Sequence, residues 1–134
     1  MITAATCLAM AIYYEARNET NPDAGLAVAE VILNRVDDPR WPDNVCAVVK
    51  QDKGPKPHDC QFSFYCDGKP ERPKHKQAWA DSQATAKQAL SGDVLGHGAL
   101  YYHATYSRPV WRHSLTLVGK IGSHVFYTDQ STSV

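Results

Sequence analysis

Apolar positions in the first part of the chain recur at the spacing of a helix. Counted from Leu8, the residues at i+3, i+4 and i+7 are Ala11, Ile12 and Glu15, which share one face of a 3.6-residue period. This pattern predicts a helix over residues 4–18. The last member of the otherwise apolar stripe is a carboxylate, so the position of Glu15 needs a chemical explanation.

A second helix is predicted from Asn21 to about Val36. Asn21 is a suitable N-cap, and Pro22 fits the first helical position, where no backbone N–H is needed. The helix carries a broad apolar face suited to the core. Glu30 and Asn34 lie one turn apart on its less apolar side, and we expect both to face solvent.

The rest of the chain alternates between short apolar runs and turn signals. Helical spacing returns from about 77 to 91, with Gly92 as a stop signal. Strand-like runs are predicted at three places: residues 61–66, 99–104 and 124–127. The last two are joined by a loop that contains Pro109 and Trp111, and residues 45–49 form an apolar segment of undecided type. With no repeat and no linker, residues 1–134 predict a single α+β domain, helices with a small antiparallel β layer.

The composition of the 134 residues narrows the classes of function. Fourteen Lys and Arg balance fourteen Asp and Glu, and a nucleic-acid-binding protein would need a basic excess. No apolar run approaches the roughly 18 residues that cross a bilayer, so stable membrane insertion is not expected. The charge is unevenly spread, since residues 1–67 hold six Lys and Arg against ten Asp and Glu, and residues 68–134 hold eight against four.

Four cysteines form an even set that allows three complete disulfide pairings, which the sequence leaves open. They are Cys7, Cys46, Cys60 and Cys66. No Cys-x-x-Cys pair occurs, and the six histidines lack the spacing of a zinc motif. We therefore expect no metal site and no cofactor. Disulfides indicate an oxidising compartment, although no basic and apolar signal sequence follows Met1.

Glu15 is the leading catalytic candidate. Its apolar neighbours desolvate the carboxyl, and the C-terminal end of a helix disfavours negative charge; both effects raise its pKa and suit it to general acid catalysis. The alternative is a structural carboxylate paired with Arg17 or Arg35. Glu19 would share the face of Glu15 if the helix continued that far.

Aromatic side chains gather in the last third of the chain, interleaved with histidines. Rings with polar tips line carbohydrate clefts, where they stack on sugars and bind hydroxyl groups. The alternative is the aromatic core of a small β layer, which we expect for Phe126. The candidates for a substrate cleft in this region are Tyr102, His103, Trp111 and His124.

Seven blocks of the chain, in one order, resemble a known family. They are residues 7–19, 25–36, 45–49, 60–68, 99–104, 109–111 and 121–127, the first two being CLAMAIYYEARNE and GLAVAEVILNRV. Together they resemble the SleB-type cell-wall hydrolase family, which is named for a spore-cortex-lytic enzyme. The version with Cys46, Cys60 and Cys66 is similar to the branch found in Gram-negative bacteria and their phages.

The resemblance implies a peptidoglycan-cleaving enzyme on a small scaffold related to lysozymes and lytic transglycosylases. Such enzymes cut between N-acetylmuramic acid and N-acetylglucosamine, and the acid of the Tyr-x-Glu-Ala-Arg block falls on Glu15. Gln61 and Ser63 join the candidates for the cleft, whose partner would be a glycan strand. Asn18 stands where the family usually has Gly, a turn position that Asn tolerates.

A transglycosylase product is expected, because hydrolysing glycosidases need a second carboxylate. The sequence offers no obvious one: Glu19 would lie beside Glu15, Glu30 is expected on a polar helix face, and Asp67 lies in an Asp-Gly turn. Two rival functions remain, a zinc-dependent cell-wall amidase or peptidase that uses the histidines, and a non-catalytic glycan-binding module.

The site of action is expected to be the periplasm or cell wall. Since no signal peptide is visible, we expect a monomeric phage endolysin that waits in the cytoplasm until a holin opens the membrane. The alternative is a domain trimmed from a longer exported enzyme.

Overall fold

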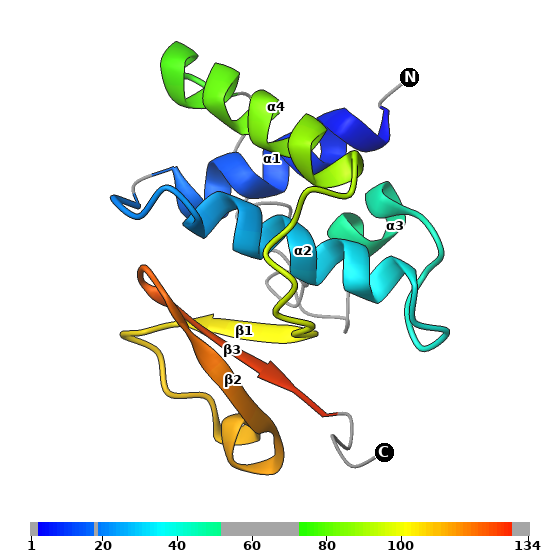
Figure 1. The fold of residues 1–134 in the computed structure, drawn as a ribbon, viewed down its shortest axis with the longest axis vertical. Helices are drawn as coiled ribbons and strands as arrows, with labels where there is room; N and C mark the ends of the chain where they lie inside the picture. The colour runs from blue at the N-terminus through cyan, green and yellow to red at the C-terminus, as the bar shows by residue number, and fades with distance from the viewer. Residues whose placement is uncertain (1–2, 18, 52–72, 130–134) are drawn as a thin grey trace.

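The computed structural model describes residues 3–17, 19–51 and 73–129. A layer of helices lies against a three-stranded antiparallel sheet, with α2 between the sheet and the other long helices (Figure 1). The helices are α1 (Ala4–Ala16), α2 (Ala24–Val36), α3 (Val45–Lys50) and α4 (Lys76–Leu90). The undecided segment 45–49 is therefore helical, and the α+β prediction is confirmed. Within the described ranges, no helix is both long and apolar enough to cross a membrane.

Helix α1 is the centre of the helical layer. It begins where the Thr3 hydroxyl accepts a hydrogen bond from the Thr6 amide, and it is buried on every side from Cys7 to Tyr13. A disulfide joins Cys7 to Cys46 in α3, which selects one of the cysteine pairs that the sequence left open. Cys60 and Cys66 lie outside the described residues.

The boundaries of the first two helices differ from the prediction. Helix α1 ends at Ala16, two residues early, and α2 begins at Ala24 after the N-cap Asp23. The Asn21 side chain accepts a hydrogen bond from the Asp23 amide at 2.9 Å, so Asn21 closes a turn before the helix instead of capping it. The predicted helix start at Asn21 and Pro22 is therefore wrong, because these residues form the turn that precedes the helix.

Helix α2 is buried on two faces, and this overturns the expectation for Glu30. Its side chain is only 3% exposed, and its carboxylate accepts hydrogen bonds from the amides of Gly96 at 2.8 Å and Gly98 at 3.1 Å. Both glycines have positive φ, +81° and +70°, and a chain in this conformation can turn successive amides toward one anion. His97 Nδ1 lies 3.6 Å from the same carboxylate.

Asn34 and Arg35 bind the next part of the same segment. Asn34 Nδ2 donates to the carbonyl of Ala99 at 2.9 Å, and Arg35 Nε donates to the carbonyl of Leu100 at 2.7 Å. The prediction that Glu30 and Asn34 face solvent is wrong, because the segment 96–100 before β1 covers this side of α2 and supplies backbone partners for its polar atoms. We call Glu30, Asn34 and Arg35 the α2 clamp, since together they hold residues 96–100.

The sheet has the strand order β1-β3-β2. Its strands are β1 (Tyr101–Ala104), β2 (Thr116–Ile121) and β3 (His124–Thr128). Strands β1 and β3 confirm two of the predicted strands. Strand β2 lies where a loop was predicted. A short 3-10 helix, η2 (Val110–Ser114), precedes β2. Strand β2 lacks a simple alternation because a register shift between Leu117 and Gly119 interrupts its pairing with β3.

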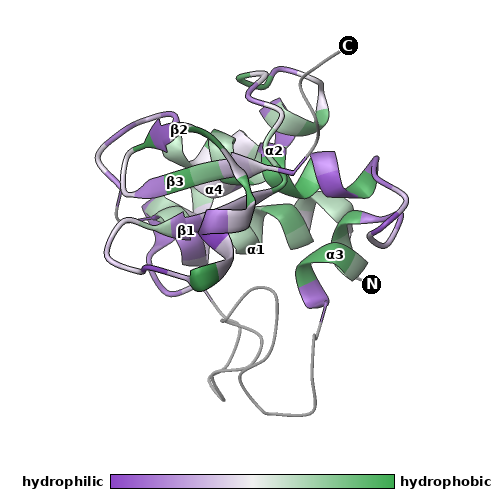
Figure 2. Cartoon of the chain, turned by 90° about the horizontal axis from the view of Figure 1, so that it is seen from below, coloured by the Kyte–Doolittle hydropathy of each residue, from purple (hydrophilic) through white to green (hydrophobic). Residues whose placement is uncertain are grey.

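The two faces of the sheet have different surroundings. Tyr102 pairs with Phe126, and both rings face the helices together with His124; this is the inner face. The alternate residues, Tyr101, His103 and Tyr127, form the outer face. Figure 2, which views the molecule from below, shows the strands in front of the helical layer. Phe126 is 1% exposed and packs with apolar residues of α2, as predicted.

Candidate functional site

Glu15 lies in the last turn of α1 and meets the inner face of the sheet. The hydroxyl of Tyr102 in β1 donates a hydrogen bond to Glu15 Oε1 at 2.6 Å. The arginines that could have paired with Glu15 are bound elsewhere: Arg17 donates to the Tyr13 hydroxyl at 2.7 Å, and Arg35 belongs to the α2 clamp. Glu15 is thus held by a neutral donor, and among the described residues its second oxygen, Oε2, makes no hydrogen bond.

The surroundings favour the protonated form of Glu15. Burial raises the pKa of the Glu15 carboxyl, and the hydrogen bond from Tyr102 opposes that rise without cancelling it. Burial also raises the pKa of the Tyr102 hydroxyl well above its ordinary value, and the neighbouring Glu15 adds to this effect. Tyr102 therefore remains a donor to Oε1 at neutral pH, which leaves Oε2 as the atom that carries a transferable proton.

His124 closes the site from the side of β3. Its ring contacts Tyr102 edge-on, with 5.2 Å between centroids, and the side chain is 6% exposed. Burial lowers the pKa of His124, against the opposing influence of Glu19, so the imidazole is neutral near pH 7. Its buried Nδ1 has no hydrogen-bond partner among the described residues.

Glu19 follows the end of α1, so it does not share a helical face with Glu15. The Glu19 carboxylate accepts a hydrogen bond from the Ser123 amide at 2.6 Å, in the turn between β2 and β3. A Cβ at the preceding Gly122 would collide with this carboxylate. Glu19 therefore fixes the β2–β3 turn, and with it the start of the strand that carries His124.

The structure divides the predicted cleft residues between the two faces of the sheet. Tyr102 and His124 lie with Glu15 on the inner side, whereas His103 and Trp111 contact each other on the outer side, 5.7 Å between centroids. Two more predicted residues, Gln61 and Ser63, lie outside the described residues, as does Asp67. The roles of the cleft residues remain predictions.

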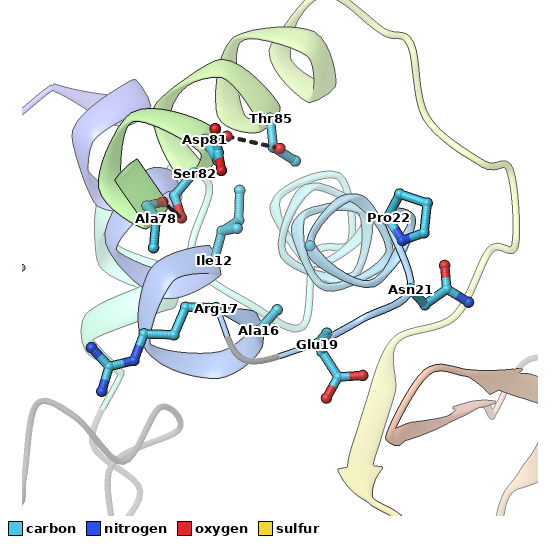
Figure 3. A pocket seen from close by; sticks show the side chains of 11 residues that line it. Ile12, Ala16, Arg17, Glu19, Asn21, Pro22, Ala78, Asp81, Ser82 and Thr85 are labelled. Carbon is cyan, nitrogen blue, oxygen red and sulfur yellow. Dashed lines mark hydrogen bonds between the residues drawn. The ribbon is translucent and has the colours of Figure 1, made fainter. Parts of the chain in front are cut away.

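Glu15 lines neither of two pockets that the described residues form. The first has a volume of about 310 Å³ and lies between α1, α4 and the start of α2 (Figure 3). Its wall includes Arg17, Glu19 and Asp81, but the Ser82 and Thr85 hydroxyls are bonded to backbone carbonyls of α4. The second, of about 330 Å³, is lined partly by Asn34 and Gly98. Across the described ranges, no group of three or more His, Cys, Asp or Glu side chains is placed to hold a metal ion.

Comparison with known families shows the family of this chain. The family model described as Cell Wall Hydrolase matches residues 19–127. The chain belongs to the cell wall hydrolase family. The matched range begins four residues after Glu15, so the role of Glu15 depends on the geometry described above and on the resemblance of the block around it.

Similar proteins of the family act in bacterial spores, according to their names. The spore cortex-lytic enzyme of Halalkalibacterium halodurans is 34% identical over 125 residues, which cover 89% of this chain and 33% of that protein. The spore cortex-lytic enzyme of Bacillus subtilis is 30% identical over 89% of this chain and 35% of its own length. The chain thus spans about a third of the length of these relatives.

Solved structures of family members share the fold. The catalytic domain of the Bacillus cereus SleB protein superposes with a TM-score of 0.72 at 27% identity, covering 93% of this chain and 89% of that one. The catalytic domain of the germination-specific lytic transglycosylase SleB from Bacillus anthracis gives 0.70 at 25% identity, covering 93% of both chains. These matches confirm the predicted SleB-type resemblance and the fold class.

Proposed function

We propose that this chain is a lytic transglycosylase that cleaves peptidoglycan between N-acetylmuramic acid and N-acetylglucosamine. The observation that carries the proposal is the Glu15 carboxyl, partly buried, raised in pKa, and bound at Oε1 by Tyr102. Membership of the cell wall hydrolase family and the likeness to SleB catalytic domains support the choice of polymer.

Glu15 acts first as a general acid. Its proton passes from Oε2 to the glycosidic oxygen while the bond from that oxygen to C1 of the muramyl residue breaks. The N-acetylglucosamine side leaves as an alcohol, and Glu15 becomes a carboxylate. Tyr102 remains on Oε1, where its hydrogen bond strengthens as negative charge develops, so the interaction favours the transition state over the ground state.

The same carboxylate then acts as a general base. It accepts the proton of the muramyl 6-hydroxyl, whose oxygen attacks C1 and forms the 1,6-anhydro bond. This returns Glu15 to its acid form without any water entering the reaction. Attack from within the sugar also has the advantage of proximity over capture of a separate nucleophile.

The positions of the neighbouring carboxylates support this product over hydrolysis. A hydrolase needs a second carboxyl group about 5–9.5 Å from the acid to activate water or attack C1. Glu19 is bonded to the Ser123 amide, and Glu30 is enclosed between α2 and residues 96–98. Both have structural partners, so neither of these two described carboxylates is free to assist Glu15, which supports the transglycosylase route.

Mass spectrometry of digested Gram-negative peptidoglycan tests the proposal. We expect muropeptides that end in 1,6-anhydromuramic acid, each lighter by one water than a reducing end. Reducing ends would show a hydrolase and would direct the search to Asp67. Cleavage that stops with a chelator would favour a zinc-dependent amidase or peptidase, and unchanged function in Glu15→Gln would favour a glycan-binding module.

The substrate also bears on where the enzyme works. Peptidoglycan lies outside the inner membrane, so we propose action in the periplasm or cell wall. Release of a cytoplasmic endolysin through a holin stays a prediction. Lysis that requires co-expression of a holin would support it.

A further inference from the structure

The outer face of the sheet carries a built cluster of rings on the side opposite Glu15. We call Tyr101, His103, Trp111 and Tyr127 the outer aromatic face. The Trp111 ring of η2 stands against the other three, with centroids 5.7 Å from His103, 5.7 Å from Tyr127 and 6.1 Å from Tyr101. His103 and Tyr127 are themselves stacked at 5.3 Å. These three ring contacts therefore fix the orientation of the Trp111 side chain.

The polar tips of these rings are used to fix the cluster. His103 Nδ1 lies 2.7 Å from the carbonyl of Ala104, an acceptor only, so Nδ1 carries the proton and Nε2 accepts from the Tyr127 hydroxyl at 2.9 Å. The Tyr101 hydroxyl donates to Asp129 at 3.0 Å. Rings fixed in this way lose little conformational entropy when a ligand stacks on them.

Exposed apolar side chains concentrate beside this cluster. Seven large hydrophobic side chains of the described residues are exposed, and five of them lie within residues 106–118. They are Tyr106, Val110, Trp111, Leu117 and Val118. Trp111 is 40% exposed although three rings support it. A concentration of this kind is typical of a binding surface and is more than isolated exposed residues would give.

The charge of the same region favours an anionic ligand. Residues 99–129 contain three cationic side chains, Arg108, Arg112 and Lys120, and a single carboxylate. That carboxylate, Asp129, is bound by the Arg40 guanidinium. Lys120 pairs with Val125 of the outer face and is exposed. Lys120 on β2 and Arg112, which follows Trp111 in η2 and donates to the Pro109 carbonyl, therefore bring positive charge to the outer aromatic face.

We propose that the outer aromatic face binds a second stretch of peptidoglycan glycan, separate from the stretch cleaved at Glu15. A sugar ring stacks on the exposed face of Trp111, and the carboxylates of the muramyl peptide substituents lie near Arg112 and Lys120. The identity of the polymer rests on the proposed function. Because the substrate is insoluble and repetitive, a second attachment raises the effective concentration of glycan at the cleaving site.

Co-sedimentation with purified peptidoglycan sacculi tests this surface. Glu15→Gln serves as the starting protein, so that cleavage does not alter the ligand during the measurement. Adding Trp111→Ala should weaken binding about tenfold, as expected for loss of a central aromatic anchor. Adding Leu90→Ala is the matched control, because Leu90 is equally exposed, at 41%, but belongs to α4; it should leave binding unchanged.

A second variant separates binding from folding. Trp111→Phe keeps a ring against Tyr101, His103 and Tyr127, so the protein should keep its melting temperature. Soluble glycan fragments should change the fluorescence of Glu15→Gln, and Trp111→Phe in that background should remove most of the change. Lys120→Gln should weaken sacculus binding about two- to threefold and reduce its salt dependence, since one exposed charge contributes little.

Activity assays distinguish this proposal from the proposed function. Trp111→Ala should lower the turnover of sacculi by a larger factor than the turnover of short soluble glycans. Equal loss on both substrates would overturn the separate surface and assign Trp111 to the cleaving site. Unchanged sacculus binding by the double variant would also overturn it, as would a dimer that Trp111→Ala dissociates. If the wild type binds sacculi through Trp111 but cleaves nothing, the transglycosylase proposal fails and the binding surface stands.

Discussion

Glu15 and Glu30 are two carboxylates that helices bring into the interior, and their surroundings differ in kind. Glu30, in the middle of α2, accepts two backbone amides and lies beside His97. Glu15, at the end of α1, receives one hydrogen bond from a neutral hydroxyl, and burial raises its pKa. One carboxylate has both oxygens bound by fixed backbone amides, whereas the other has a single hydrogen bond and a raised pKa.

The difference shows that burial alone does not mark a catalytic acid. A carboxylate whose oxygens are both occupied by fixed donors has no free position for a substrate atom, and removing it leaves those donors unpaired. A carboxylate with one free oxygen and a raised pKa can exchange its proton at little cost to the fold. Function and stability should therefore respond in opposite ways at the two positions.

The largest expected effect is on activity at Glu15. Glu15→Gln keeps the shape and can still accept the Tyr102 hydrogen bond, but it has no transferable proton, and a positioned acid typically contributes about 10²–10⁴ in rate. Cleavage of sacculi, measured by released muropeptides, should fall by at least that factor. Glu30→Gln is the control and should retain cleavage at temperatures where it is folded. Wild-type turnover by Glu15→Gln would remove Glu15 from the mechanism.

The pH dependence of stability sharpens the same test. A raised pKa in the folded state means that the folded protein binds the Glu15 proton more tightly than the unfolded chain does. This contribution to stability is complete below the ordinary carboxyl pKa, about 4, and is lost as the pH rises through the folded pKa. Glu15→Gln has no such loss. Its free energy of unfolding, relative to wild type, should increase from pH 4 toward neutrality.

The second effect is on stability at Glu30. Glu30→Ala leaves the amides of Gly96 and Gly98 without their acceptor inside the protein, and breaking a buried charged contact of this kind typically costs about 3–5 kcal/mol. Urea unfolding should show the loss as a lower midpoint. Glu19→Ala, which removes one hydrogen bond at the exposed β2–β3 turn, should cost far less. Equal costs would show that the clamp is not what joins the layers.

The third effect concerns the anchoring of α1, which carries Glu15. The Cys7–Cys46 disulfide closes a loop with a sequence separation of 39, and bridges of this type typically contribute about 2–4 kcal/mol. A reductant should lower the melting temperature of the oxidised protein. Cys7→Ser with Cys46→Ser should melt at the lower temperature and respond less to reductant. Thiol titration that finds Cys7 and Cys46 free in oxidised protein would contradict the bridge.

The smallest effect is expected at Tyr102. Tyr102→Phe keeps the ring stacked on Phe126 but removes the donor to Glu15, and the net cost of one such hydrogen bond is about 1 kcal/mol. Because the Tyr102 hydrogen bond lowers the pKa of Glu15 against the effect of burial, its loss should raise that pKa further. The alkaline limb of the rate profile should then move to higher pH. Tyr101→Phe, on the outer face, should not move it.

Local patterns were sufficient for much of the fold and for the acid itself. The stripe from Leu8 to Glu15 located the carboxylate at a helix end, and the runs around Tyr102 and His124 located two strands. These features depend on residues close together in sequence, where periodicity is informative. Strand β2 was missed because its pairing is interrupted at Leu117 and much of it is exposed.

The features that the sequence did not predict depend on contacts between distant segments. The helix pattern predicts a solvent-facing Glu30 because it does not say that a distant segment, residues 96–100, will cover the polar side of α2. The signal available in the sequence was the pair of glycines around His97. Glycines can adopt the positive φ that both show here, and a turn of this kind directs its amides toward one anion. The division of Tyr102 from His103 follows from strand alternation, but which face would meet Glu15 depends on how the layers pack.

The α2 clamp has a consequence for motion in the protein. Strand β1 begins one residue after Leu100, so Tyr102 cannot lift away from Glu15 unless the segment 96–100 peels off α2. Such peeling exposes the amides of Gly96 and Gly98 to water, where they exchange hydrogen for deuterium. The exchange rate of these two amides therefore sets an upper limit on how often the layers part and Tyr102 leaves Glu15.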